Sequence, residues 1–317
     1  MTDVPDTVRE IARLVSGAID DRLPLGDLRV HEAAEHLLTA GGKRLRPALL
    51  MVVADAFGRS PRETVPPALA VEITHSFTLI HDDVMDDDPL RRGEESVHAK
   101  WDVPTAILTG DYLYSKAFET ALETSASDET MRRVMETLAE TCTLICEGQA
   151  LDVEHAEAET VEEKDYIRMV ELKTGVLFAA STGIGALVSE SGVFEEAYGY
   201  GLRIGKAFQI HDDVLDIVGD SDDLGKARAS DLFEGKNTLV TLHAQRNGVD
   251  TTLPDDATDA EVEAKVEEIR DAGSIDYARG RAETLVEEAK EDLDAFPEGD
   301  QRAALADIAD YLVRRTY

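Results

Sequence analysis

The sequence predicts an all-α protein built as a single domain over residues 1–317, and three observations support this prediction. Apolar residues recur at helical spacing through most of the chain, whereas the alternating pattern of half-buried strands is absent. Gly and Pro stand at the ends of the apolar segments, and no linker rich in Pro, Gly or Ser divides the chain. A chain of 317 residues can also bury a large core. We therefore expect one large bundle of about a dozen helices.

The boundaries of the first helices follow from Gly and Pro, because Gly favours the end of a helix and Pro cannot continue one. Pro24 with Gly26, Gly41 with Gly42, and Pro89 mark three helix ends. The helices delimited in this way are residues 3–21, 30–40, 47–57 and 68–86.

The later helices are predicted to be longer. Pro104 stands near the start of one that runs to Glu123. Continuous helical periodicity then predicts three more, at residues 128–155, 161–189 and 193–218. A loop is expected at residues 219–235. Beyond Lys236 we expect shorter helices, with an acidic linker near residues 250–259.

One short stretch occurs twice, at residues 80–86 (IHDDVMD) and 210–216 (IHDDVLD), with six of seven positions identical. On a helix the first and last Asp of each copy lie one turn apart, about 6 Å, and the middle Asp is rotated away. Like charges this close are unfavourable unless a cation lies between them, and carboxylates without Cys or paired His suit Mg²⁺. A solvated acidic face is the alternative. The candidate metal ligands are Asp82, Asp86, Asp212 and Asp216.

The chain is strongly acidic, with 66 Asp and Glu residues against 32 Lys and Arg residues, a net charge of −34. Such a surface repels nucleic acids and anionic membranes, so neither is an expected partner. Only ten of the basic residues are Lys. An acidic, Lys-poor composition suggests a halophilic protein, adapted to high salt.

The two Cys residues and the N-terminal segment indicate a cytoplasmic protein. Cys142 and Cys146 lie one helical turn apart with no further metal-ligand pattern, so buried thiols are favoured over a disulfide or a metal site. The segment MTDVPDTVRE lacks the basic and apolar regions of a signal peptide. No run of 18 apolar residues predicts a membrane anchor.

Basic residues gather near the acidic clusters. GGKRLRP (residues 41–47) places three cations in four residues where Gly leaves the backbone exposed to a diphosphate, although a Gly cap followed by solvated cations is the alternative. Arg91 and Arg92 follow the first cluster and can grip phosphate oxygens in pairs. His75 lies seven residues before Asp82, on the same helix face, where it is either structural or a phosphate donor. Four of the ten Lys residues lie in such stretches: Lys43, Lys173, Lys226 and Lys236.

The order of these motifs resembles that of the trans-isoprenyl diphosphate synthases, in particular the archaeal geranylgeranyl diphosphate synthases. The matching stretches are GGKRLRP (41–47), HDDVMDDDPLRRG (81–93), GQALD (148–152), KTG (173–175), FQIHDDVLD (208–216), GK (225–226) and EGKNT (234–238). The resemblance implies the isoprenoid synthase fold, a helical bundle around a deep central cavity, in a homodimer. It also implies head-to-tail condensation of isopentenyl diphosphate with dimethylallyl, geranyl or farnesyl diphosphate, assisted by several Mg²⁺ ions.

The same resemblance implies a role for each site residue. It assigns the metal to the Asp residues named above and the isopentenyl diphosphate to Lys43, Arg46, His75 and Arg92. It assigns the allylic diphosphate to Arg91, Lys173, Thr174, Gln209, Lys226 and Lys236. Lys173, Thr174 and Gln209 form the catalytic centre, where Thr174 and Gln209 present oxygen dipoles to the allylic cation. The isopentenyl double bond attacks this cation, and the released diphosphate takes up the proton.

Product length is predicted from the residues that precede the first acidic cluster. Phe77 lies five residues before Asp82, about 7.5 Å down a helix axis, and Thr78 follows it. In the family, bulky residues here form the floor of the prenyl cavity. A single aromatic resembles the geranylgeranyl diphosphate synthases, whereas two would indicate a farnesyl product. Core packing of Phe77 is the alternative.

Three other functions were compared with this one. A synthase of farnesyl or longer prenyl diphosphates differs only in product length. A class I terpene cyclase shares the metal-assisted ionisation, but it does not need the second diphosphate site that Lys43, Arg46 and Arg92 suggest. A non-catalytic subunit of a heteromeric synthase can lack an acidic cluster, whereas both clusters are intact here.

Overall fold

The computed structural model describes residues 5–22, 24–158, 160–219, 229–254 and 256–314. Within these ranges the regular secondary structure is helical except for one small antiparallel hairpin, formed by β1 (Leu90–Arg91) and β2 (Glu94–Glu95). The predicted all-α class is therefore confirmed.

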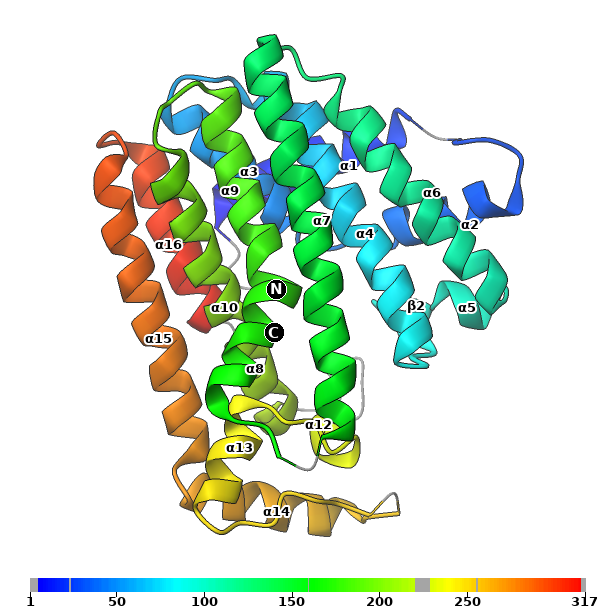
Figure 1. Cartoon of the computed structure of the whole chain (residues 1–317), viewed down its shortest axis with the longest axis vertical. Coiled ribbons are helices and arrows are strands. Elements are labelled where there is room, and N and C mark those ends of the chain that lie inside the picture. The colour runs from blue at the N-terminus through cyan, green and yellow to red at the C-terminus, as the bar shows by residue number, and fades with distance from the viewer. Residues whose placement is uncertain (1–4, 23, 159, 220–228, 255, 315–317) are drawn as a thin grey trace.

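The helices follow one another in the order shown in Figure 1. Those of the first half are α1 (Asp6–Asp20), α2 (Arg29–Thr39), α3 (Leu45–Ala56), η1 (Pro61–Thr64), α4 (Val65–Met85), α5 (Val97–Lys100), α6 (Val103–Ala121) and α7 (Asp128–Glu157). Those of the second half are α8 (Glu163–Val170), η2 (Glu171–Gly175), α9 (Val176–Val188), α10 (Phe194–Val218), α12 (Ser230–Phe233), α13 (Leu239–Arg246), α14 (Asp259–Asp271), α15 (Ser274–Asp292), η3 (Leu293–Ala295) and α16 (Asp300–Arg314).

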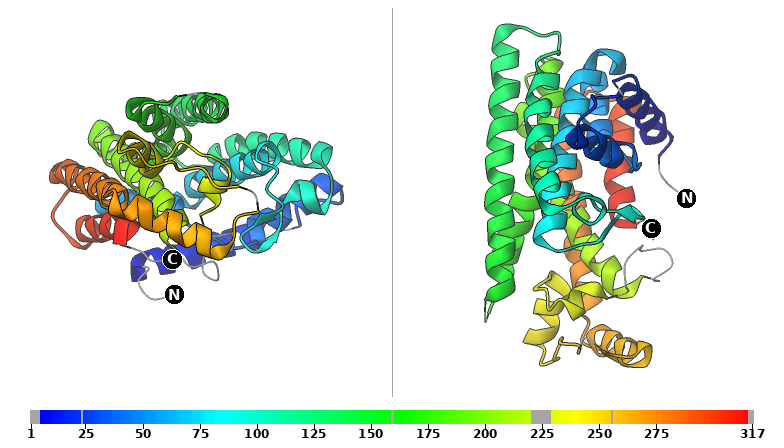
Figure 2. Two further views of the ribbon diagram at one scale, coloured as in Figure 1. Left: turned by 90° about the horizontal axis from the view of Figure 1, so that it is seen from below. Right: turned by 90° about the vertical axis from the view of Figure 1, so that its right-hand side faces the viewer.

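Helix α9 lies at the centre of the bundle, and all of its residues are buried. It packs against α3, α7 and α10, while α15 and α16 cover the outer side of α10. Figure 2 shows α7 and α1 on opposite sides of the molecule. Helices α4 and α6 run side by side, and α13 with α14 lies at one end (Figure 1). The acidic cluster of α4 and that of α10 are thus carried by separate helices of one bundle.

The predicted helix boundaries agree with the structure to within a few residues, with two instructive exceptions. The predicted helix 161–189 is interrupted by η2, which is a π-helical turn. The prediction from apolar periodicity did not detect this turn, and such turns occur often at functional sites. The predicted loop at residues 219–235 was wrong in part, because Ser230–Phe233 forms the short helix α12. The prediction of shorter helices beyond Lys236 is confirmed, since α13, α14, α15 and α16 have 8, 13, 19 and 15 residues, against 30 in α7 and 25 in α10.

Side-chain caps explain where two of the long helices begin. Asp102 accepts a hydrogen bond from the backbone N–H of Thr105 (2.7 Å) at the start of α6, and Ser127 accepts one from Thr130 (3.2 Å) at the start of α7. Each cap satisfies an N–H group that has no partner within the helix. These caps place α6 and α7 on either side of a short loop.

One helical run of the described chain, Glu163–Val188, is long and apolar enough to cross a membrane by length and composition alone. It comprises α8, η2 and α9. Because 89% of its most apolar window is buried inside the protein, this run is the core of the bundle.

Candidate active site

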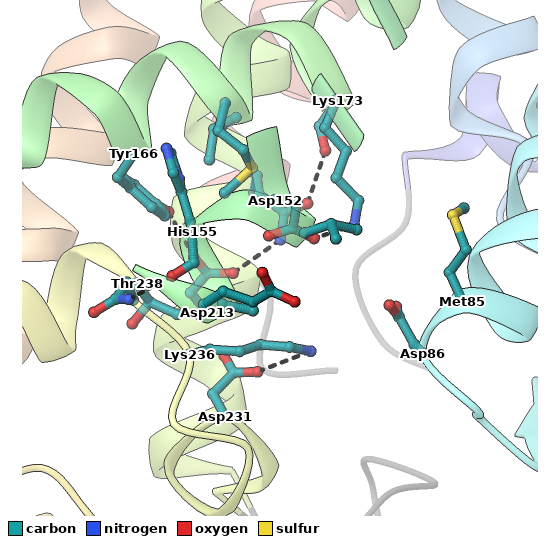
Figure 3. A pocket seen from close by; sticks show the side chains of 18 residues that line it. Met85, Asp86, Asp152, His155, Tyr166, Lys173, Asp213, Asp231, Lys236 and Thr238 are labelled. Atoms are coloured by element: carbon teal, nitrogen blue, oxygen red, sulfur yellow. Dashed lines mark hydrogen bonds and ion pairs between the residues drawn. The ribbon is translucent and has the colours of Figure 1, made fainter. Parts of the chain in front are cut away.

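A cavity of about 320 Å³ lies between α4, α7, α8, η2 and α10, next to the segment that leads into α13 (Figure 3). Charged side chains reach the cavity from α4, α7, η2 and α10 and from the segment before α13. The lining includes Asp86, Asp152, Asp213, Asp231, Lys173 and Lys236. Carboxylates outnumber ammonium groups in this set. The cavity therefore favours cations, or an anionic ligand that binds as a complex with cations.

Lys173 reaches the cavity from the π-helical turn η2. Its Nζ lies 2.6 Å from Oδ2 of Asp152, on α7. The two elements approach closely because residue 148 is Gly: a Cβ at this position would lie 2.3 Å from the backbone N of Lys173. Burial opposes the charge of Lys173, but Asp82 and Asp152 outweigh it, so the pKa of Lys173 is raised and the ammonium group is retained.

The first acidic cluster occupies the C-terminal end of α4. Burial raises the pKa of Asp82 to about 6; Lys173 opposes this shift and Asp86 adds to it. Asp83 points elsewhere, since its Oδ1 accepts a hydrogen bond from Nε of Arg91 (2.6 Å) and its side chain is 1% exposed. The predicted rotation of the middle Asp is therefore confirmed in this copy, while metal binding by Asp82 and Asp86 stays a prediction.

The second acidic cluster is arranged differently. Its middle residue, Asp213, lines the cavity, so the expectation that this side chain is rotated away was wrong for the second copy. Asp216 accepts hydrogen bonds from the Ser230 hydroxyl (2.6 Å) and the Asp231 N–H (3.0 Å), and it thereby ties α10 to α12. Asp212 is partly buried. Their predicted role as metal ligands is neither supported nor contradicted by these contacts.

The chemistry of the donor set fits a divalent cation held jointly with a ligand. Among the described residues, no group of three or more His, Cys, Asp or Glu side chains comes close enough together to hold a metal ion. Asp86 instead faces Asp213 and Asp231 from the opposite wall (Figure 3). Carboxylate oxygens suit Mg²⁺, which takes its remaining ligands from water and phosphate. The arrangement therefore fits metal ions that bridge the two walls through a bound phosphate group.

A second basic region forms where the loop before α3 meets the β1–β2 hairpin. The guanidinium group of Arg92 donates a hydrogen bond to the carbonyl of Gly41, and a Cβ on Gly42 would lie 3.1 Å from Cζ of Arg92. The Arg46 guanidinium lies 4.5 Å from the centroid of the Phe178 ring, within cation–π range. Burial lowers the pKa of Arg46 to about 10, so this group still carries its charge at neutral pH.

His75 belongs to the same region. Burial, followed by the charges of Arg46, Arg92, Arg44 and Arg91, holds the pKa of His75 well below its usual 6.5. The imidazole is therefore neutral at pH 7 and can donate one hydrogen bond. The structure thus brings three of the residues assigned to isopentenyl diphosphate into one region, and the fourth, Lys43, is exposed in the loop beside it.

Arg44, the middle cation of GGKRLRP, faces the core instead. It is 4% exposed and forms an ion pair with Glu72, which is 2% exposed. Its Nη2 also donates to the carbonyl of Leu38 (2.7 Å). Arg44 adopts φ +50°, which turns the chain into α3. Its positive charge is therefore committed to the protein interior, in contrast to those of Lys43 and Arg46.

The cations assigned to the allylic diphosphate are paired with acidic groups in this structure. Arg91 forms its ion pair with Asp83, and Lys236 pairs with Glu234 (2.7 Å) and more distantly with Asp231 (3.7 Å). Lys226 lies outside the described residues. The predicted diphosphate contacts of these residues stay predictions.

Thr174 and Gln209 meet at the inner end of the cavity. The Thr174 hydroxyl donates to Oε1 of Gln209 (2.9 Å), and Nε2 of Gln209 donates to Oδ1 of Asp213 (2.8 Å). Tyr166 donates to the other oxygen of Asp213 (2.5 Å). Burial, opposed by these hydrogen bonds, raises the pKa of Asp213.

The two residues predicted to set product length lie on α4, between the acidic cluster and the middle of the helix. Phe77 is 6% exposed and packs edge-on against Tyr114 of α6, with ring centroids 5.3 Å apart. Thr78 donates to the carbonyl of His75 (2.8 Å). The Phe77 ring thus fills the space between α4 and α6.

Several polar residues of the cavity were not among the predicted site residues, including Asp152, Tyr166, Asp213 and Asp231. Asp152 could have been predicted from the sequence, because it is the last residue of the GQALD stretch and follows Gln149 by one helical turn. Asp213 is the middle Asp of the second repeat, and helical phase predicted that its side chain is rotated away from the metal site. Tyr166 and Asp231 carry no local pattern, since only the packing of α8 and α12 brings them to the cavity.

Similarity to known proteins covers almost the whole chain. A geranylfarnesyl diphosphate synthase of Natronomonas pharaonis is 47% identical over 335 aligned positions, which cover 99% of this chain and 98% of that protein. A geranylgeranyl diphosphate synthase of Methanosarcina mazei is 44% identical, with 98% of each chain covered. The solved structure of the geranylgeranyl pyrophosphate synthetase from Geoglobus acetivorans superposes with a TM-score of 0.92 at 39% identity, covering 98% of this chain and 100% of that one.

The polyprenyl synthetase family profile matches residues 28–273. This range contains both acidic clusters, the basic region around Arg46 and the π-helical turn that carries Lys173. The match, together with relatives of more than 40% identity over their full length, is decisive. The chain belongs to the polyprenyl synthetase family.

Proposed function

We propose that this protein is a trans-prenyltransferase that condenses isopentenyl diphosphate head-to-tail with an allylic diphosphate. The observation that carries the proposal is the presence of two anion sites of different chemistry. One combines carboxylates with Lys173 and Lys236 and suits a diphosphate that arrives with metal ions. The other combines Arg46, Arg92 and neutral His75 and suits a diphosphate bound directly.

In this proposal Asp82 and Asp86 of α4 and Asp212 and Asp216 of α10 are the residues that would hold Mg²⁺. When bound, Mg²⁺ supplies positive charge that stabilises the leaving diphosphate. Lys173 and Lys236 are protonated, because nearby carboxylates raise their pKa values. They bind oxygens of the same diphosphate. Arg91 and Lys226 are proposed to complete this site.

Thr174 and Gln209 contribute oxygen atoms where positive charge develops. Both side chains line the cavity and are joined by a hydrogen bond. As the allylic C–O bond breaks, an oxygen dipole fixed near the carbon stabilises the cation without reorganisation. The π electrons of isopentenyl diphosphate then form the new C–C bond, and the released diphosphate accepts the proton that restores the double bond.

We propose geranylgeranyl diphosphate as the main product. The buried ring of Phe77, packed against Tyr114, supports a floor at this depth below Asp82. A geranylfarnesyl product is the second candidate, because the relative from N. pharaonis bears that name.

A homodimer is proposed as the working assembly. Helix α6 carries several large apolar side chains that are exposed in the single chain, which is unusual for a surface that faces water. These residues are Val103, Ile107, Leu108 and Tyr114, and Leu122 directly follows the helix. A second copy of the chain would cover them.

The decisive test is an incubation of the purified chain, in salt that keeps it folded, with labelled isopentenyl diphosphate, one allylic primer at a time, and Mg²⁺. We expect the primer to be elongated. Sizing of the labelled products should then show mainly geranylgeranyl diphosphate. Turnover of geranylgeranyl diphosphate without isopentenyl diphosphate would instead indicate a terpene cyclase. Activity that requires a second, different chain would indicate a subunit of a heteromer.

A further inference from the structure

We propose that Tyr166 and Asp213 are positioning residues that hold the Gln209 amide with its carbonyl oxygen, rather than its NH₂ group, available to the reacting carbon. The inference rests on the prenyl transfer proposed above. It assigns a task to two buried residues that need not touch the substrate, and it explains why the middle Asp of the second acidic repeat faces inward.

The geometry is a continuous chain of hydrogen bonds across three elements. Tyr166 of α8 donates to Asp213 Oδ2 (2.5 Å), and Gln209, one turn earlier on α10, donates through Nε2 to Asp213 Oδ1 (2.8 Å). Thr174 of η2 then donates to Gln209 Oε1 (2.9 Å). Both oxygens of Asp213 and both ends of the Gln209 amide are engaged.

The orientation of the amide follows from the charge of Asp213. An ionised carboxylate can only accept hydrogen bonds, so the amide must turn its NH₂ group towards Asp213. A flipped amide would place Oε1 against a carboxylate oxygen and lose the hydrogen bond to Asp213, whereas the Thr174 hydroxyl can either donate or accept. Tyr166 matters because it fixes the second oxygen of Asp213 and thereby the plane of the carboxylate.

The sign of the dipole decides the chemistry. Positive charge develops on the allylic carbon as the C–O bond breaks, and an amide oxygen stabilises this charge, whereas an N–H group opposes it. An amide free to rotate would present either end. A hydrogen-bonded partner that selects one end therefore lowers the barrier to ionisation without contributing to the binding of either diphosphate.

The alternative is that the Tyr166 hydroxyl only stabilises the fold. The chain offers a matched control for this alternative in Tyr200 of α10. Tyr166 is 1% exposed and Tyr200 is fully buried. The Tyr200 hydroxyl also donates a single short hydrogen bond, to the carbonyl of Leu305 (2.7 Å) in α16, with no link to Gln209.

The experiment compares the full-length variants Tyr166→Phe, Asp213→Asn and Tyr200→Phe. The single-turnover rate is measured with excess enzyme, farnesyl diphosphate, isopentenyl diphosphate and Mg²⁺, alongside KM for each substrate and the melting temperature. We expect Tyr166→Phe and Asp213→Asn to lower the single-turnover rate by about tenfold or more, with both KM values nearly unchanged. Tyr200→Phe is expected to lose stability but to keep the wild-type rate.

A second comparison uses the Gln209→Met background, in which no amide remains to be oriented. There Tyr166→Phe should cause no further loss of rate, because its effect passes through Gln209. An equal loss in both backgrounds, or a Tyr166→Phe rate equal to that of Tyr200→Phe, overturns the inference. If Tyr166→Phe does not fold, Asp213→Asn carries the same comparison. Absence of any condensation by the wild-type chain would instead refute the proposed prenyl transfer.

Discussion

Gly148 of α7 lies directly against the backbone of Lys173 in η2. A Cβ atom at residue 148 would lie 2.3 Å from the Lys173 N and 2.7 Å from its Cα. Because of this contact, Asp152, one turn after Gly148, reaches the ammonium group of Lys173 at 2.6 Å. The close approach of two backbones thus sets the position of the Lys173 ammonium group.

We therefore expect Gly148→Ala to separate α7 from η2. Overpacking of this kind costs about 1–3 kcal/mol of folding free energy, and a displaced Lys173 should lower kcat by about tenfold to a hundredfold. Gly280→Ala is the matched control, because nothing lies within 4 Å of a Cβ there and Gly280 is inside α15. This control should gain about 0.5–1 kcal/mol and keep full activity. Thermal melts and steady-state kinetics of both variants decide the matter.

The buried pair of Arg44 and Glu72 is expected to serve the fold. Arg44→Met leaves Glu72 charged and unpaired in the core, which should cost about 3–5 kcal/mol. The double variant Arg44→Met/Glu72→Leu should recover most of this loss. Lys43→Met, at an exposed position next in sequence, should change stability by less than about 0.5 kcal/mol and raise KM for isopentenyl diphosphate. Equal stability of the Arg44 and Lys43 variants would contradict this division of roles.

His75 makes stability depend on pH. Its pKa in the folded protein is well below 6.5, so below this value the unfolded chain takes up a proton that the folded protein does not. The contribution of neutral His75 is therefore present above pH 6.5 and is lost as the pH falls, by at most about 1.4 kcal/mol per pH unit. His75→Gln should show a shallower loss of unfolding free energy between neutral and mildly acidic pH. Denaturant titrations at several pH values give the dependence of the unfolding free energy on pH for the wild type and for His75→Gln. The same dependence in both proteins would argue against a neutral His75.

Phe77→Ala is expected to lengthen the products by one or more isoprene units, since it removes the ring that packs against Tyr114 between α4 and α6. Phe296→Ala is the control. Phe296 is also buried and also forms an aromatic pair, with Phe57 at 5.3 Å. Each substitution should cost about 3–5 kcal/mol, but only Phe77→Ala should change product length. Chromatographic sizing of labelled products measures product length. An unchanged distribution of product lengths for Phe77→Ala would show that Phe77 does not form the floor of the prenyl cavity.

The net charge of −34 predicts a requirement for salt. Repulsion between surface carboxylates is screened over about 3 Å at 1 M salt but over about 10 Å at 0.1 M. Dilution from molar to low salt should therefore unfold the protein, and the far-UV circular dichroism signal should be lost. A signal that does not change over this range would show that the chain is not adapted to high salt.

Much of the fold could be predicted from local patterns. The helix of residues 128–155 was placed almost as observed, at Asp128–Glu157, because its apolar periodicity is a property of the segment itself. The rotation of Asp83 away from Asp82 and Asp86 followed from helical phase alone. The irregular turn η2 could not be predicted, because it depends on the contact with Gly148, 25 residues earlier.

By itself, the sequence determined the all-α class, the two acidic clusters and the cationic stretches around them, since helical phase and residue type are local properties. Only the tertiary structure decided which of these charges serve the cavity. Arg44 pairs with Glu72 in the core whereas Arg46 lies over the ring of Phe178, and Asp213 of the second repeat lines the cavity whereas Asp83 of the first pairs with Arg91. The physical reason is that the cost of burying a charge depends on its partner, and these partners come from elements far apart in the chain.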